Sequence, residues 1–204
     1  MPRQPRFLLR VRALTLLMLA SLFLLATPTT AEAGWSSGLR PLWVSLGGAG
    51  GGGISTDQGH GYASLTVGLR LIPIVPEVTI REGVSGRGST LLHHHGNIAL
   101  GARLLLPGLP FLRPNVRFAF SHRHDAPMDV FEAKPLAVIF GTASGITHRS
   151  GFETGAGIEL SFGPKKIVGA YVQGTLVVLP PAQQDLVTGL VEAGVSFSIG
   201  PPRP

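Results

Sequence analysis

The sequence contains no cysteine, which excludes both a disulfide framework and a lipid anchor attached through cysteine. Polar aromatic side chains are also scarce, with two Trp and two Tyr in 204 residues. Beyond residue 33, no apolar run approaches the roughly 20 residues that a transmembrane helix needs. These absences exclude a disulfide-stapled secreted domain and an α-helical membrane protein.

The N-terminus has the layout of an export signal. Four basic residues open the chain: Arg3, Arg6, Arg10 and Arg12. The apolar run Ala13–Ala26 has 14 residues, which is short for a membrane span, and Ala31-Glu32-Ala33 has the small-x-small pattern of a cleavage site. We therefore predict a signal peptide over residues 1–33. It holds four of the 17 basic residues and one of the 11 acidic residues, so the net charge falls from +6 to +3 and indicates no nucleic-acid partner.

The rest of the chain consists of short segments in which apolar residues alternate with polar or small ones, the period of a β-strand. In residues 61–72, for example, Leu65, Val67 and Leu69 share one face, and polar or small residues share the other. The pattern recurs in seven further segments: 41–48, 77–82, 96–106, 112–121, 152–162, 167–179 and 187–199. The sequence thus predicts an all-β fold of eight antiparallel strands.

The connections between these segments alternate in length. Residues 73–76, 107–110 and 163–166 form tight turns, whereas 49–60, 83–95, 122–151 and 180–186 form longer links. In an up-and-down meander this places the turns at one end and the loops at the other, as in transmembrane β-barrels. The glycine run 47–53 is interpreted as part of a flexible first loop. The apolar segment Leu136–Phe140 is placed inside the third long loop, although a ten-stranded barrel stays open.

Side-chain size and charge indicate which face of the sheet turns inward. The polar face is rich in small residues, namely Gly47, Gly68, Ala99, Gly101, Ala119, Gly155, Gly157 and Gly194. A narrow eight-stranded lumen needs such residues beside long ones, whereas a water-facing surface does not. The same face carries nearly balanced charges, which we expect to form an ion-paired network that plugs the lumen: Arg70, Glu77, Arg81, Arg103, Arg113, Arg117, Glu153, Glu159 and Glu192. The alternative is a soluble periplasmic barrel, with an apolar interior that binds an apolar ligand.

In this topology two groups of aromatic residues are expected at the membrane interfaces. One group, near the tight turns, is Trp43, Phe111, Phe162 and Phe197; the other, near the long loops, is Tyr62, Phe120 and Phe152.

The strand layout over residues 41–199, with a closing strand GVSFSIG that carries Phe197, resembles the small OmpA/OmpX-type outer-membrane barrels. Residues 34–40 would then be a short N-terminal segment and 200–204 a tail. The resemblance implies a monomer in the cell outer membrane of a Gram-negative bacterium. It also implies contact with outer-membrane lipid and lipopolysaccharide, and insertion by the barrel assembly machinery. No cofactor is implied. Such folds carry many functions, and we expect a structural or surface-interaction role without enzymatic activity.

The seven histidines all fall in or beside the expected long loops: His60, His93, His94, His95, His122, His124 and His148. Imidazole binds Zn or Ni, so His93, His94, His95, His122 and His124 are candidate metal ligands, with Asp57, Asp125 and Asp129 as additional donors. Metal capture by external loops is therefore an alternative function.

A second alternative is hydrolysis, because some small barrels resemble lipid A deacylases with a Ser–His–acid set near the outer rim. His148 and Ser150 share one face of an extended segment, and Ser121-His122 is another such pair. A triad also needs an acid to orient the histidine. The nearby Glu153 and Glu159 fall on the inward face, so the third member is missing from this interpretation.

Overall fold

The computed structural model describes residues 41–53, 58–71, 73–87, 89–109, 111–163, 165–180 and 187–200. The expected signal peptide, the segment 34–40, most of the tail and Asp57 lie outside the described residues.

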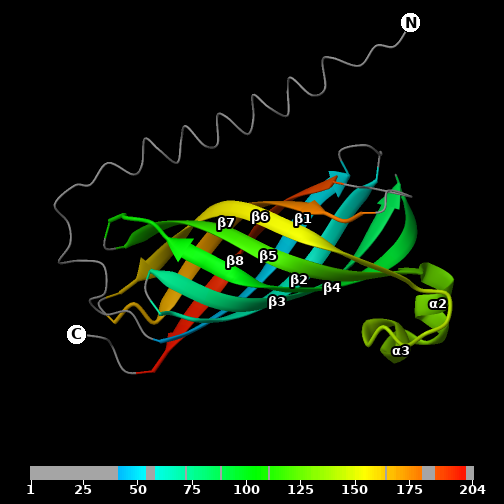
Figure 1. Ribbon diagram of the computed structural model, residues 1–204, viewed down its shortest axis with the longest axis horizontal. Coiled ribbons are helices and arrows are strands. Elements are labelled where there is room, and N and C mark those ends of the chain that lie inside the picture. Colours follow the sequence, from blue (N-terminus) through cyan, green and yellow to red (C-terminus); the bar gives the residue numbers. More distant parts are fainter. Residues whose placement is uncertain are drawn as a thin grey trace, which may run out of the picture. The chain divides into compact units, whose positions relative to one another are not determined.

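Eight antiparallel strands form a closed barrel in which each strand pairs with the next along the chain and β8 pairs with β1 (Figure 1). The strands are β1 (Leu42–Gly53), β2 (Gly59–Leu69), β3 (Ile74–Arg87), β4 (Thr90–Leu105), β5 (Leu112–Pro127), β6 (Thr147–Phe162), β7 (Val168–Val178) and β8 (Val187–Ile199). The eight-stranded up-and-down barrel is thus confirmed. The ten-stranded alternative is wrong, because the ladder closes after eight strands.

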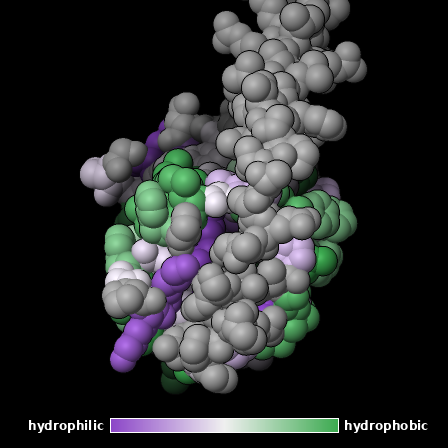
Figure 2. Space-filling view, turned by 90° about the vertical axis from the view of Figure 1, so that its left-hand side faces the viewer, coloured by the Kyte–Doolittle hydropathy of each residue, from purple (hydrophilic) through white to green (hydrophobic). Residues whose placement is uncertain are grey.

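The barrel turns its apolar side chains outward and its charged side chains inward. In β2, exposed and buried residues alternate without a break, with Leu65, Val67 and Leu69 exposed and Thr66 buried. The interior holds most of the charged strand residues, such as Arg81 and Glu153, and exposed Leu, Ile, Val and Phe side chains cover the outer wall. Figure 2, which looks onto one end of the barrel, shows apolar residues along both flanks. This distribution is the inverse of a soluble barrel, since a soluble barrel turns its apolar face away from water.

The two ends of the barrel differ. At one end, here called the turn end, tight connections join β2 to β3, β4 to β5 and β6 to β7. The opposite end, here called the helical end, carries α2 (Met128–Ala133) and α3 (Pro135–Ile139) between β5 and β6 (Figure 1). In these helices, Val138 packs with Ala126 and Ala143, and Phe131 packs against that cluster. The segment Leu136–Phe140 does lie within the third connection, but there Leu136 to Ile139 belong to α3 and Phe140 caps that helix.

The expected long loops are shorter than predicted, because the strands continue toward the helical end. β3 ends at Arg87 and β4 begins at Thr90, so most of the expected loop 83–95 is strand. All seven histidines lie on strands β2, β4, β5 and β6 rather than in loops. The sequence shows no clear alternation there, because the outer face of these extensions carries polar residues as well as the inner face. None of the described helices has the length and apolar character needed to cross a membrane.

The glycine run is likewise strand and not a flexible loop, since β1 includes Gly47 to Gly53. Its glycines make room for neighbours inside the barrel. A Cβ atom at Gly47 would lie 2.2 Å from the Tyr171 hydroxyl and 2.6 Å from the Ala193 carbonyl oxygen. A Cβ atom at Gly48, which faces outward, would lie 3.7 Å from its nearest neighbour, an ordinary contact.

These two adjacent glycines give a matched test of the register. Gly47→Val should destabilise the folded barrel by about 1–3 kcal/mol, the usual range for overpacking a filled interior, whereas Gly48→Val should be nearly neutral. Urea unfolding of detergent-folded protein measures both. Equal losses in the two variants would show that Gly47 does not face Tyr171.

Candidate functional site

A continuous chain of ion pairs crosses the middle of the lumen. Its order is Arg103, Glu77, Arg117, Glu153, Arg81 and Glu192. The Arg103 Nε–Glu77 Oε2 distance is 2.9 Å, and Arg117 Nε bonds the other oxygen of Glu77. Arg117 Nη1 lies 2.5 Å from Glu153 Oε2, and Arg81 bridges Glu153 at 2.9 Å to Glu192 at 3.1 Å. Every member is at most 4% exposed, so solvent screens these pairs little.

Neutral hydroxyl groups satisfy further lone pairs of these carboxylates. Tyr171 donates to Glu192 at 2.7 Å, Ser64 donates to the same oxygen at 2.9 Å, and Ser121 donates to Glu153 at 3.0 Å. Such hydrogen bonds are what make buried charges tolerable, because an unpaired charge in this interior would cost several kcal/mol. Together they join seven strands: β2 through β6 by way of Ser64, Glu77, Arg103, Arg117 and Glu153, and β7 and β8 by way of Tyr171 and Glu192.

A second group of charges lies at the turn end. Arg70 Nη2 lies 2.5 Å from Glu159 Oε1, and Arg113 donates to Ser161 at 3.0 Å. Arg103 stacks over Trp43, with its guanidinium carbon 4.4 Å from the ring centroid. In the adjoining turn, partial burial and the nearby Arg113 lower the pKa of Lys166.

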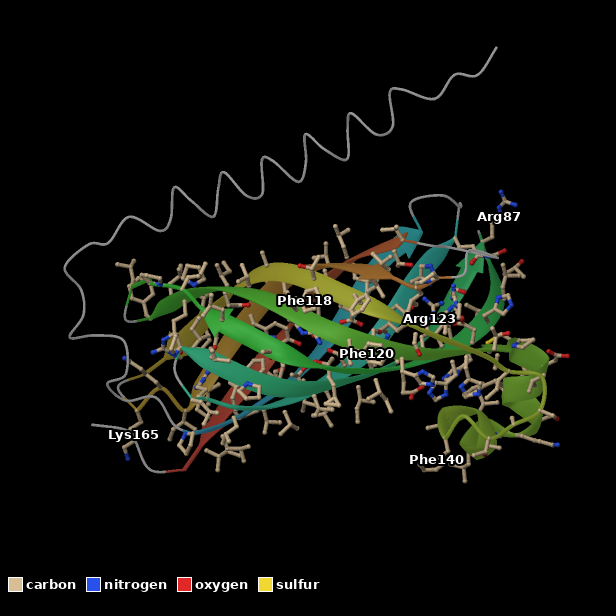
Figure 3. The ribbon with its side chains drawn as sticks, viewed as in Figure 1. Arg87, Phe118, Phe120, Arg123, Phe140 and Lys165 are labelled. Atoms are coloured by element: carbon tan, nitrogen blue, oxygen red, sulfur yellow. The ribbon has the colours of Figure 1, made fainter. Side chains whose placement is uncertain are left out.

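The placement of Trp43 corrects the expected aromatic pattern. Trp43 and Tyr62 are both buried, so neither lies in an interfacial belt. In the part of the chain that the structure describes, the exposed aromatic residues are phenylalanines: Phe111, Phe118, Phe120, Phe140, Phe152, Phe162 and Phe197. Figure 3 shows Phe118 and Phe120 on the middle of the barrel and Phe140 at the helical end.

A third buried cluster, missed in the sequence, lies inside the helical end. Asp125 accepts from Arg123 Nε at 2.5 Å and from Arg149 Nε at 2.8 Å, and its Oδ1 lies 2.5 Å from His95 Nδ1. The sequence does not reveal this cluster, because the polar residues around His95 and Asp125 predict a loop. A loop prediction gives no inward or outward direction to their side chains.

The outer wall of β5 and β6 carries a serine and three histidines. Ser150 lies directly opposite His122 in the strand register, and His148 lies opposite His124. The His122 Nδ1–Ser150 Oγ distance is 3.0 Å, and the His122 Nε2–His148 Nδ1 distance is 3.3 Å. Ser121, the sequence neighbour of His122, is instead buried in the lumen. The Ser121-His122 pairing is therefore wrong, since the two side chains lie on opposite sides of the wall.

The five candidate metal ligands do not form one group. His95 faces the lumen beside Asp125, whereas His94 stacks on Phe131 of α2 with ring centroids 4.2 Å apart and lies 3.2 Å from Glu82. His93 lies 6.1 Å from the His95 ring. His122 and His124 are on the outer wall. Gly141 lies close against His124, since a Cβ atom at Gly141 would be 2.9 Å from His124 Nδ1. Within the described ranges no three His, Asp or Glu side chains are arranged to hold a metal ion, and metal capture stays a prediction.

Comparisons with known proteins bear on the fold. No protein-family model matches the sequence, and no curated protein matches it either. Among solved structures, Neisserial surface protein A is similar at a TM-score of 0.59 and 12% identity, over 78% of this chain and 97% of that one. The N-terminal β-barrel domain of Pseudomonas aeruginosa OprF is similar at a TM-score of 0.50 and 12% identity, over 79% of this chain and 98% of that one. The attachment invasion locus protein Ail of Yersinia pestis is similar at a TM-score of 0.51 and 10% identity, over 79% of this chain and 99% of that one.

These likenesses show the fold. The chain has the eight-stranded barrel architecture of small outer-membrane proteins, the OmpA/OmpX type that the strand layout predicted.

The central ion-pair chain gives a test of what holds the barrel closed. Glu153→Gln removes the charge shared by Arg81 and Arg117 and should destabilise the fold by about 3–5 kcal/mol, because it leaves two buried cations short of a partner. Glu132→Gln, on the exposed surface of α2, is the control. The measurement is the urea midpoint in detergent micelles. Matching midpoints for both variants would contradict a supporting role for Glu153.

Proposed function

We propose that this chain is an exported protein of the Gram-negative outer membrane, whose barrel has a filled, ion-paired lumen and which acts through its outer surface. The observation that carries the proposal is the sidedness of the barrel: paired Arg and Glu inside, Leu, Ile, Val and Phe outside. Only a lipid surrounding favours that distribution, because an exposed apolar wall in water would aggregate. The apolar N-terminal segment with its cleavage pattern supports export.

The lumen is the wrong interior for an apolar ligand. Its wall carries charged and hydroxyl side chains, many of which pair with one another across the lumen. One cavity, bounded by residues that include Tyr62, Arg81 and Glu153, has a volume of about 10 Å³, close to the minimum that holds one water molecule. We therefore favour a membrane barrel over the soluble apolar-ligand barrel, and we expect no conducting pore.

A surface role agrees with the asymmetry of the two ends. The turn end offers short connections, whereas the helical end offers α2 and α3, with Leu136 and Phe140 68% and 74% exposed. Contact with lipopolysaccharide at the outer leaflet and insertion by the barrel assembly machinery belong to this proposal. Neisserial surface protein A and Ail are named for surface location and attachment, which is compatible with it.

Two measurements on the mature protein test the proposal. Detergent-folded protein should migrate differently on a gel before and after heating, since a closed barrel resists unfolding by the detergent. In planar bilayers the same preparation should give no lasting conductance, because ion pairs fill the lumen. Steady channel openings from heat-modifiable protein would refute the filled lumen, and protein that stays soluble without detergent would refute the membrane location.

A further inference from the structure

We infer that Ser150, His122 and His148 form a serine hydrolase site on the outer wall of the barrel, and that this site cleaves ester-linked acyl chains of a membrane lipid. The inference rests on the proposed membrane location, because the site faces the surroundings of the barrel and not its lumen.

The geometry is that of a nucleophile with its base and a third residue. Ser150 Oγ lies 3.0 Å from His122 Nδ1, within reach for transfer of the hydroxyl proton. The other nitrogen of that ring, Nε2, lies 3.3 Å from His148 Nδ1. With Nε2 protonated and donating to His148, the lone pair of His122 Nδ1 faces the serine, which is the tautomer a general base needs.

The third member is the imidazole of His148, which stands where a triad usually has a carboxylate. A neutral imidazole nitrogen accepts a hydrogen bond as a carboxylate does, though without the negative charge. His148 is held beside His124, with ring centroids 5.6 Å apart. Gly141, at a φ of +69°, lies against both rings, since a Cβ there would be 2.9 Å from His124 and 3.3 Å from His148. His148 is therefore a positioning residue for His122.

The site lies where the outer wall changes from apolar to polar. Two residues along each strand from His122 and Ser150 come Phe120 and Phe152, whose rings are 5.9 Å apart, with Phe118 equally close to Phe152. The stretch Leu112–Phe120 has nine residues, about the length that a tilted strand needs to cross the hydrocarbon layer. Ser150 is thus placed at the edge of that layer, where the ester groups of a lipid lie between its head group and its chains.

The surrounding surface suits an acyl chain. The exposed rings of Phe118 and Phe120 lie on the middle of the barrel, and Phe140 lies at the helical end (Figure 3). Leu136 of α3 is exposed as well. Ser150 itself is exposed, so a substrate reaches it without any opening of the barrel.

The reaction balances without a cofactor. Ser150 Oγ attacks the ester carbonyl carbon while its proton passes to His122 Nδ1. The tetrahedral intermediate then collapses, the C–O bond of the alcohol breaks, and the alcohol leaves with the proton from His122. Water, deprotonated by the same nitrogen, attacks the acyl-serine, and the free fatty acid and the original serine result.

The test uses detergent-folded mature protein with two probes: a fluorophosphonate, which labels an activated serine, and vesicles of ester-linked phospholipid with lipopolysaccharide. Wild-type protein should be labelled at Ser150, as located by mass spectrometry, and should release free fatty acid. Ser150→Ala should abolish both signals. His122→Gln should slow both by about 10²–10⁴-fold, the usual contribution of a general base. Thr154→Ala removes an exposed hydroxyl on the same face of β6 and should leave both signals unchanged.

His148 has its own readout. His148→Ala should slow labelling at neutral pH, whereas His148→Glu should restore or exceed the wild-type rate, because a carboxylate accepts the same hydrogen bond. A purely structural role would not be rescued by a change of charge.

Heat-modifiable migration is recorded for every variant, which separates the two proposals. Folded wild-type protein that is neither labelled nor releases fatty acid overturns the hydrolase and leaves the membrane barrel standing. Labelling at another serine, or labelling unaffected by His122→Gln, also overturns it. Absence of heat-modifiable migration in wild-type protein refutes the barrel proposal on which it rests.

Discussion

The chain of ion pairs in the lumen is the constraint on which the other features depend. Burying six charged side chains in a narrow barrel is unfavourable unless each meets opposite charge and hydrogen bonds. Glu77, Glu153 and Glu192 do so because each accepts from an arginine and from a further donor on another strand. A barrel with the strands shifted would leave these charges unpaired. The network therefore favours one strand register over the alternatives, in addition to stabilising the closed barrel.

Glycine is the counterpart of these long side chains. Gly101, Gly155 and Gly157 lie on the inward face, and a Cβ atom at any of them would come within 2.7 Å of a neighbouring atom. Space inside an eight-stranded barrel is limited, so each arginine requires small residues around it. These inward glycines therefore provide the space that the buried arginines occupy.

The sequence was sufficient for most of this architecture. In segments whose outer face is apolar, alternation is strict, and the residues that the sequence assigns to the lumen, from Arg70 to Glu192, are all buried. Beyond the apolar belt that signal disappears, because both faces of a strand extension are polar. His95 and Asp125 were therefore assigned to loops although they lie on β4 and β5. Trp43 was placed at an interface because aromatic residues favour one, but here its ring stacks under Arg103.

The sequence also does not show which residues lie opposite each other on paired strands. Residues 121 and 122 are adjacent in the chain, yet one lies in the lumen and the other on the outer wall, whereas His122 and Ser150 are 28 residues apart and directly opposite. Only the register brings them together, and the lumen determines that register. With Arg117 and Glu153 held inward, the even-numbered residues of β5 and β6 must face outward, since a shift by one residue reverses every side chain. The outer Ser–His–His arrangement is in this sense a consequence of the ion pairs inside.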